Sequence, residues 1–364
     1  MASRLKLYVT AWMCCFLFLP GLSARKTFKA DTVTLISFND FHGYFVKDAV
    51  APGASALVRA VLEEKAASPH PFVVSGGDNF SGSFFSRMTK GEPLPEMFRL
   101  MGVTVSAVGN HEFDWGKEYL QSNSTKDMTY VAANIEAESE CGQSWLPAYK
   151  ILSCTLKNGA PFRIAFIGLT TVETQYKTSA ENVAGLRFVH PYAAAAIQLA
   201  YHLKKEGKID MAVLLCHVGT DMRVPGRFQE CDTKMLPYME GVNAIITAHS
   251  HKVVLDEING VPVIQAGSYG RYLGKLQFKV TPVRKSDAFR VEYIGGDTIP
   301  VDRDKRHAGM EEYVEKYTKQ YRFDEVLTRA EDDILRDSRT YSVMGGLVTA
   351  SYVACFKKNM PADS

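Results

Sequence analysis

Five apolar segments of this chain end next to residues that commonly bind metal ions. The segments have the β-branched and apolar composition of buried strands, and they are residues 33–38, 71–75, 103–108, 211–216 and 242–247. Directly after them come Asp40 and His42, Asp78, Asn110 and His111, His217, and His249 and His251. Parallel strands end at a common sheet edge, so side chains that follow them can meet in one cleft. The pattern therefore predicts an α/β fold with a polar site at that edge.

Helical segments separate the earlier strands. Residues 54–66 and 94–101 have apolar residues at helical spacing, and residues 192–205 form a long Ala-rich segment. Further strands are expected at residues 129–134, 162–168, 261–265 and 273–280. The alternation of strand and helix predicts a mostly parallel sheet early in the chain, and the shorter links later predict a second, mixed sheet.

The charge balance excludes a general nucleic-acid surface. The chain has 364 residues, with 42 Lys and Arg against 40 Asp and Glu, and 46% of its residues are hydrophobic. This length allows one large domain or two smaller ones. Since the chain is not basic overall, an anionic substrate would be attracted by local charge, which bound divalent metal can supply.

Residues 1–24 are predicted to be a secretory signal peptide. Arg4 and Lys6 form a basic start, residues 7–20 are apolar but short for a membrane span, and residues 21–24 are small enough for cleavage. An uncleaved anchor is the alternative, and in both cases the chain enters the secretory route. Five cysteines would remain, and Cys141–Cys154 and Cys216–Cys231 are the expected disulfides.

Two N-glycosylation motifs occur. Asn123-Ser-Thr125 follows a polar stretch and suits a surface loop, so we expect a glycan at Asn123. Asn79-Phe-Ser81 directly follows Asp78. A glycan at Asn79 would collide with a site built around Asp78, so we expect none there.

The character of the chain changes after residue 302. Residues 303–340 are expected to be a charged helical linker. Residues 341–356 are apolar and are followed by Lys357 and Lys358, which allows a membrane anchor or a buried helix. The stretch is short and contains Ser, Thr and paired Gly, so we favour a buried helix. The polar ending of residues 359–364 argues against a lipid-anchor signal.

The clustered residues have the donor types that a site for two divalent cations needs. Asp40 and His42 are two residues apart, so on an extended strand both would face one side and could reach one ion. Asp78 has two carboxylate oxygens and could bridge two ions, and Asn110 offers a neutral carbonyl oxygen. His217, His249 and His251 complete the set. Such donors suit zinc, manganese, iron or cobalt, and zinc or manganese are the metals we expect.

His111 and Asp114 are predicted to form a catalytic dyad. Three residues apart in a helical first turn, they would lie on the same side. A carboxylate behind an imidazole orients it and favours the imidazolium, which can stabilise charge that develops on a phosphoryl or leaving oxygen. Each motif alone also has an ordinary structural explanation: a helix cap for the dyad, a core histidine for His217, and turns for Asp40-Phe-His42 and Gly77-Asp78.

The order of these motifs resembles the calcineurin-like metallophosphoesterases, and the longer matches resemble the 5'-nucleotidase branch. They are NDFHG at 39–43, GGDNFSGS at 76–83, AVGNHEFDWG at 107–116, IGLTT at 167–171 and VIQAGSYGRYLGKL at 263–276. The resemblance implies a four-layer α/β/β/α metallophosphoesterase sandwich over residues 25–302, with a short C-terminal helical extension. It implies one ion held by Asp40, His42, Asp78 and His251, and a second held by Asp78, Asn110, His217 and His249. It also implies that Asn110 and His111 contact the substrate phosphate.

Two features depart from the family pattern. Family members usually have Gly before the His-x-His pair, where this chain has Ala248. The family also adds a second domain that holds the nucleoside, and here Met344-Gly-Gly-Leu347 resembles only its opening. We therefore expect residues 341–364 to be a remnant of that domain, without the nucleoside clamp, and we expect loose base selectivity.

These observations predict a secreted dinuclear phosphohydrolase that removes phosphate from nucleotides, with a metal-bound hydroxide attacking phosphorus in line. A phosphodiesterase or nucleotide-sugar hydrolase with the same metal centre is one alternative. A truncated protein that binds metal and nucleotide without turnover is an alternative of a different class.

Overall fold

The first sheet carries the strands that precede Asp40, Asp78 and Asn110. This sheet has six strands in the computed structural model. The structure describes residues 29–124, 127–139, 143–189, 192–220, 241–284, 286–326, 329, 334 and 342–359. In spatial order the six strands are β14 (Phe289–Pro300), β13 (Tyr272–Pro282), β1 (Asp31–Phe38), β2 (Pro71–Ser75), β3 (Val105–Ala107) and β4 (Thr129–Val131). The four strands β1 to β4 run parallel, and β13 and β14 are antiparallel additions beside β1.

The second sheet carries the strands that precede His217 and His249. It also has six strands, in the order β11 (Val253–Ile258), β12 (Val261–Ala266), β10 (Ala244–Ile246), β9 (Met211–His217), β7 (Pro161–Thr170) and β6 (Tyr149–Thr155). The inner four are parallel and the two edge strands are antiparallel. A small antiparallel pair joins β5 (Ile135–Ala137) to β8 (Leu186–Phe188).

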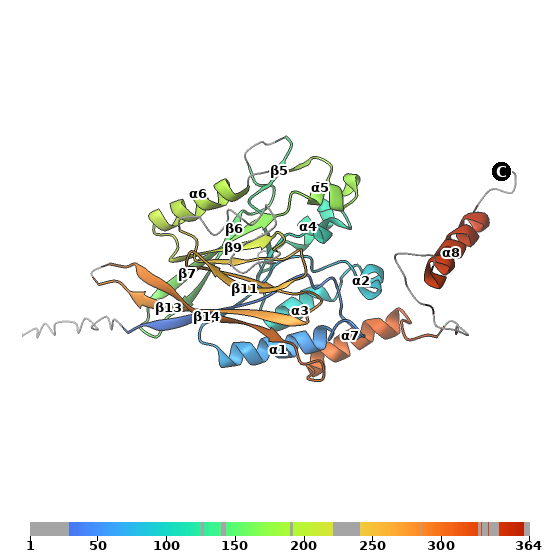
Figure 1. Cartoon of the computed structure of the whole chain (residues 1–364), viewed down its shortest axis with the longest axis horizontal. Helices are drawn as coiled ribbons and strands as arrows, with labels where there is room; N and C mark the ends of the chain where they lie inside the picture. Colours follow the sequence, from blue (N-terminus) through green and yellow to red (C-terminus); the bar gives the residue numbers. More distant parts are fainter. Residues whose placement is uncertain are drawn as a thin grey trace, which may run out of the picture. The chain divides into compact units, whose positions relative to one another are not determined.

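The two sheets pack face to face, and helices cover their outer faces (Figure 1). Strand β7 contributes to both the core between the sheets and the core under the helices, because successive side chains of a strand point to opposite faces. Ile164 and Phe166 join the core between the sheets, where they meet residues such as Val33 and Leu35 of β1. Their neighbours Ala165 and Ile167 join the outer core together with side chains of α6 (Tyr192–Lys205). This arrangement confirms the predicted four-layer α/β/β/α class.

Helices α1 (Ala54–Ala67) and α3 (Leu94–Met101) cover the first sheet, where α1 packs on β1 and on α3. The buried side of α3 consists of Leu94, Met97, Phe98 and Met101, at helical spacing. The helix ends where Gly102 adopts a left-handed conformation with φ 74°. The shorter helices α2 (Phe84–Thr89), α4 (Lys117–Asn123) and α5 (Thr174–Lys177), and the 3-10 turns η1 (His111–Phe113) and η2 (Ala180–Val183), lie in the connections between strands.

Besides the short pair β5 and β8, the described residues contain three strands that the sequence pattern did not predict, namely β6, β11 and β14. All three are antiparallel edge strands with partly exposed side chains, so they lack the continuous apolar run of a buried parallel strand. The charged helix after residue 302 is α7 (Ala308–Gln320). The chain divides into two compact units, Met1–Glu311 and Glu312–Ser364, and the predicted domain boundaries stay predictions.

The apolar segment near the carboxyl terminus forms helix α8 (Val343–Asn359). Its predicted burial is wrong, because most of its described side chains are exposed, including Tyr352 at 73% and Phe356 at 66%. Its apolar residues are spread around the helix, so no single face of it is suited to burial. Among the described residues, no helix has the length and apolar character that crossing a membrane requires.

The predicted disulfides of Cys154 and Cys216 are not formed. Cys154 on β6 and Cys216 on β9 are free thiols. Cys216 points into the core between β9 and α6, where burial raises the pKa of its thiol. Cys141, Cys231 and the predicted signal peptide lie outside the described residues.

Candidate metal centre

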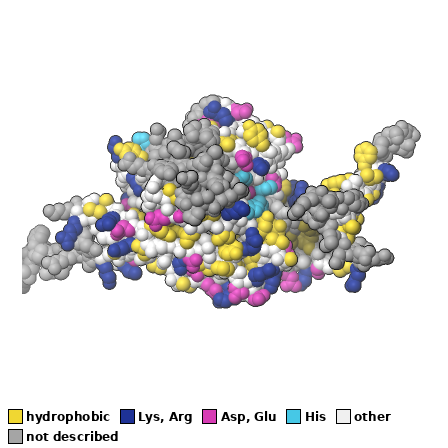
Figure 2. All heavy atoms as spheres, in the orientation of Figure 1, with side chains coloured by type: hydrophobic (Ala, Val, Ile, Leu, Met, Phe, Trp, Pro, Cys, Tyr) yellow, Lys and Arg dark blue, Asp and Glu magenta, His cyan; other side chains and the backbone are white. Residues whose placement is uncertain are grey.

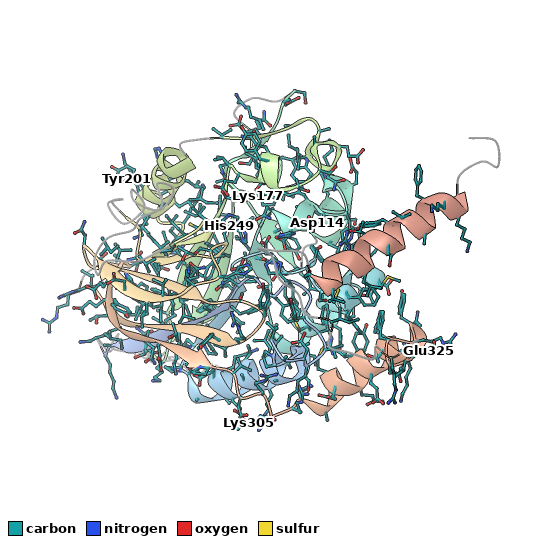
Figure 3. The ribbon with its side chains drawn as sticks, turned by 45° about the vertical axis from the view of Figure 1, so that its right-hand side comes forward. Asp114, Lys177, Tyr201, His249, Lys305 and Glu325 are labelled. Carbon is teal, nitrogen blue, oxygen red and sulfur yellow. The ribbon has the colours of Figure 1, made fainter. Side chains whose placement is uncertain are left out.

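The predicted ligands converge where the parallel strands of both sheets end. Asp40 and His42 follow β1, Asp78 follows β2, Asn110 follows β3, His217 ends β9, and His249 and His251 follow β10. Histidine side chains gather on one part of the molecular face in Figure 2, and His249 and Asp114 are labelled in Figure 3. The convergence follows from the parallel strand direction, which brings the carboxyl ends to common edges.

One group of donors consists of Asp40, His42 and His251, whose ligand atoms lie within 4.8 Å of one another. The Nε2 atoms of the two histidines face each other at 2.9 Å. Asp40 Oδ1 is 3.6 Å from His251 Nε2 and 4.0 Å from His42 Nε2. Two imidazole nitrogens and a carboxylate oxygen therefore point at one small space.

A second group consists of Asp78, His217 and His249. Asp78 Oδ2 is 3.1 Å from His217 Nε2 and 3.8 Å from His42 Nε2, so this carboxylate links the second group to the first. A further cluster of the same compactness, His42, Asp78 and His111, brings the predicted catalytic imidazole to the same place. Asp78 thus lies where a bridging ligand would have to lie.

Two buried atoms of the site have no hydrogen-bond partner, namely Asn110 Oδ1 and His217 Nε2. His217 Nε2 lies 3.1 Å from Asp78 Oδ2, but the two atoms do not have hydrogen-bond geometry. Unpaired buried polar atoms are costly, and each of these atoms would be satisfied by a cation. The donor set of carboxylate, amide oxygen and imidazole therefore fits divalent metal ions.

The electrostatics of the buried acids agree with this fit. Burial, aided by the charge of Asp78, raises the pKa of Asp40 to about 7 in spite of nearby His217. Burial opposes the imidazolium of His217, but the negative charge of Asp78 at 3.1 Å outweighs it and raises the pKa of His217 to about 10. Burial and His42 lower the pKa of His251 to about 4. The buried carboxylate of Asp40 thus lacks sufficient positive charge, which divalent cations would provide.

Backbone strain is concentrated in the predicted ligands. Asp40, His42, Asp78, His249 and His251 all have positive φ, between 50° and 72°. The expectation that Asp40 and His42 share a side because they lie on an extended strand is therefore wrong, since β1 ends at Phe38. Their side chains converge because the loop is held in left-handed conformations, which cost a non-glycine residue free energy and often cluster at functional sites.

Hydrogen bonds hold the predicted ligands in place from behind. His42 Nδ1 is 2.8 Å from the carbonyl of Ser81, and His217 Nδ1 is 2.9 Å from the carbonyl of Gly76. Asn39 donates to Asp40 Oδ2 at 2.6 Å and to the carbonyl of Gly267 at 2.7 Å. Such partners fix the orientation of metal-binding side chains.

Glu112 joins two of the ligand loops, which the sequence reasoning did not foresee. Its fully buried carboxylate accepts hydrogen bonds from the backbone N–H groups of Asp78 (2.8 Å), Asn79 (2.7 Å) and Gly109 (2.6 Å). Burial and the charge of Asp78 raise the pKa of Glu112 to about 7. Its position between Asn110 and Asp114 was the only sequence signal for this role.

The predicted dyad is formed. His111 Nδ1 lies 2.8 Å from Asp114 Oδ2 at the η1 turn. Burial opposes the imidazolium, but the hydrogen bond to Asp114 and the charge of Asp78 outweigh it and raise the pKa of His111 to about 9. These groups favour the imidazolium form of His111, which lies beside Asp78 and His42.

Two further residues at the site were not assigned from the sequence, although one of them, Tyr269, lies within the motif at 263–276. Glu173, which precedes α5, places Oε2 3.3 Å from His249 Nε2. Tyr269 has φ 61°, donates its backbone N–H to the carbonyl of Asp40 at 2.7 Å, and packs its ring against His42 and His251.

The remaining expectations concern residues around the site. Ala248 is fully buried and, unlike His249, does not have positive φ, so Ala fits without the strain that a family glycine suggested. Asn79 is fully buried and bonded to Glu112 and Ser106, which agrees with the expectation of no glycan there. Asn123 ends α4 and is partly exposed.

The two packed sheets and the shared donor cluster define a metal-dependent phosphoesterase domain. Comparison with known families agrees, since residues 33–253 match the Calcineurin-like phosphoesterase family, which is more than half of the chain. The chain belongs to this family, as the resemblance of its motifs implied. The predicted kinship with 5'-nucleotidases is also confirmed among its relatives.

The chain is 26% identical to a 5'-nucleotidase of Vibrio vulnificus over 79% of its own length and 56% of the relative's. It is 27% identical to the endonuclease YhcR of Bacillus subtilis over 73% of its own length and 23% of the relative's. The crystal structure of the calcineurin-like phosphoesterase YfkN from Bacillus subtilis shares the fold, with a TM-score of 0.70 at 18% identity, covering 80% of this chain and 98% of that one. The chain thus spans about half or less of the length of these two sequence relatives.

Proposed function

We propose that this chain is a phosphohydrolase that uses two divalent cations, zinc or manganese, to remove phosphate from nucleotides. One ion would be held by Asp40, His42, Asp78 and His251, and the other by Asp78, Asn110, His217 and His249. The observation that carries the proposal is that Asp78 lies within reach of both donor groups, next to the His111–Asp114 pair. When bound, the two cations would activate a water and neutralise the phosphoryl charge.

Protein side chains would supply proton transfer, contact the phosphate and hold the ligand loops in place. Asp114 would orient His111 and favour its protonated form through the hydrogen bond at 2.8 Å. Imidazolium at this position would stabilise charge on a phosphoryl oxygen or give its proton to the leaving oxygen. Asn110 would contact the phosphate together with His111. The buried hydrogen bonds of Glu112 and Asn39 keep the ligand loops fixed during the reaction.

The experiment is an assay of the full chain after chelation and reloading with Zn²⁺, Mn²⁺ or Co²⁺. Phosphate release would be measured from AMP and ATP, and hydrolysis to monophosphates would be measured for a nucleotide-sugar and a cyclic nucleotide. Metal-dependent release from AMP or ATP supports the proposal. A folded, metal-loaded chain that releases phosphate from none of them would overturn it.

A phosphodiesterase activity is the second candidate, because one relative at 27% identity is an endonuclease. The same donor set can serve a phosphodiester. Hydrolysis of bis(p-nitrophenyl) phosphate faster than p-nitrophenyl phosphate would favour this candidate over the monoesterase.

We also propose that the chain is exported by the predicted signal peptide at residues 1–24 and carries a glycan at Asn123. The support is the sequence pattern and the partly exposed position of Asn123 at the end of α4. Secretion from a eukaryotic host, followed by a glycosidase-sensitive size shift that Asn123→Gln abolishes, would be the expected result.

A further inference from the structure

The histidines of the metal centre are oriented in two different ways. His42 and His217 each direct Nδ1 at a backbone carbonyl, that of Ser81 at 2.8 Å and that of Gly76 at 2.9 Å. A carbonyl only accepts, so a neutral ring at either position has its proton on Nδ1 and the lone pair of Nε2 directed at the carboxylates. Both side chains are buried, and no side-chain substitution can remove a backbone carbonyl.

His249 is held differently. Its Nε2 lies 3.3 Å from Oε2 of Glu173, while its backbone N–H donates to the carboxylate of Asp40 at 3.0 Å. A carboxylate also only accepts, so neutral His249 has its proton on Nε2 and its lone pair on Nδ1. Glu173 is half exposed, with 51% of its side-chain surface accessible. His249 is therefore a predicted ligand whose orientation rests on one replaceable, half-exposed side chain.

We propose that Glu173 is a positioning residue for the ion of the group Asp78, His217 and His249. By accepting the Nε2 proton, Glu173 fixes the tautomer and ring orientation of His249 and makes it a stronger ligand. Among the described residues, no hydrogen bond or ion pair joins Glu173 to the other group, Asp40, His42 and His251. Glu173 would thus set the affinity for one of the two ions. This inference rests on the proposed function.

A purely structural role for Glu173 predicts something different. Glu173 precedes α5 and pairs with Lys177, one helical turn on, at 3.9 Å (Lys177 is labelled in Figure 3). If Glu173 acted only through this helix, its loss would lower the stability of the ion-free chain, and Lys177→Ala would have the same effect. The two roles are therefore separable by experiment.

The test is a calorimetric titration of the full chain, freed of metal by chelation, with Mn²⁺. The wild type should bind two ions. Glu173→Ala should weaken one of the two affinities by about 10–100-fold, the usual effect of losing such a partner, and leave the other unchanged. Glu173→Gln, whose amide oxygen can still accept from Nε2, should recover part of the loss. Lys177→Ala is the matched control and should bind both ions as the wild type does.

The outcomes separate this inference from the proposed function. A wild type that binds no ion would overturn both. Two ions in the wild type with unchanged affinities in Glu173→Ala and Glu173→Gln would overturn the role of Glu173 alone. Equal losses in Lys177→Ala and Glu173→Ala, with lowered thermal stability of both ion-free variants, would assign the effect to α5 and also reject the inference.

Discussion

The backbone N–H of His111 donates a hydrogen bond of 2.8 Å to Oδ1 of Asp78. The carboxylate that lies between the two donor groups therefore also fixes the peptide that carries the candidate catalytic imidazole. A change in the position of the Asp78 carboxylate would therefore also shift the backbone of His111, because this hydrogen bond joins them directly. This relationship couples metal binding to the placement of the dyad, and it guides the choice of variants below.

His111→Ala should lower the rate of phosphate release by roughly 10²–10⁴-fold, the usual contribution of a positioned proton-transfer group. Metal content should stay at the wild-type value, because the proposed ligands are untouched. Rates and bound metal would be measured on the same samples. His202→Ala, an exposed position on α6, is the control and should behave as wild type. Wild-type rates in His111→Ala would leave this imidazole without a catalytic role.

Glu112→Gln should destabilise the fold by about 1–3 kcal/mol, because an amide NH₂ would face backbone donors that now bond to a buried carboxylate. The donors are the N–H groups of Asp78, Asn79 and Gly109. Urea unfolding of the chelated protein measures the effect. Glu118→Gln, an exposed glutamate on α4, should change stability little. Equal stability of the two variants would contradict the account of Glu112.

Gly109→Ala should disrupt the metal centre. A Cβ at this position would lie 2.1 Å from Oδ1 of Asp78 and 2.7 Å from its backbone nitrogen, so Asp78 must move. We expect weaker metal binding and a lower melting temperature. Gly207→Ala is a control in open space, where an added Cβ meets nothing within 4 Å, although its φ of 65° adds some strain. Unchanged metal affinity in Gly109→Ala would show that the loop tolerates the displacement.

Asp31 should make stability depend on pH in the acid range. Burial alone would raise its pKa, but hydrogen bonds from the backbone of Lys157 and Thr32 and from His70 lower the pKa to about 2 from its usual 3.8. A pKa lowered by folding gives stability that is complete above pH 3.8 and is lost as the pH falls towards 2. After allowance for the exposure of Lys157, the contribution is about 1 kcal/mol.

The free energy of unfolding of wild type and Asp31→Asn would be compared between pH 3 and pH 6. The advantage of the wild type should be constant near pH 6 and shrink as the pH falls below about 4. An advantage that does not change with pH would contradict the lowered pKa of Asp31.

The buried parallel strands were predictable because strands that are buried on both faces have short, nearly continuous apolar runs. Strand β2 occupies the predicted residues, and α3 begins and ends at the predicted Leu94 and Met101. Strand β14 was not predictable in the same way. It contains Gly295, Gly296 and Asp297, exposes one face, and depends on pairing with β13 across a register shift. Strand β14 is stabilised by pairing with β13, which precedes it in the chain and lies beside it in the sheet. Its own residue pattern does not mark it as a strand.

The site was predictable in its residues but not in its geometry. Asp40 and His42 were expected to share a strand face, whereas left-handed backbone at both positions turns them toward the same space. Glu173 was missed because it lies in a connection between β7 and α5, where no apolar period marks a position as special. Its contact with His249 forms only once β7 and β10 lie in the same sheet, on either side of β9.

The most direct test of the central claim is the number of divalent ions bound per folded chain, measured by elemental analysis after chelation and reloading with Zn²⁺ or Mn²⁺. The account predicts two ions for the wild type. It predicts fewer for Asp78→Ala, since Asp78 lies within reach of both donor groups. A folded wild type that retains no ion under any loading condition would contradict the account, and so would an Asp78→Ala variant that binds both ions as tightly as the wild type.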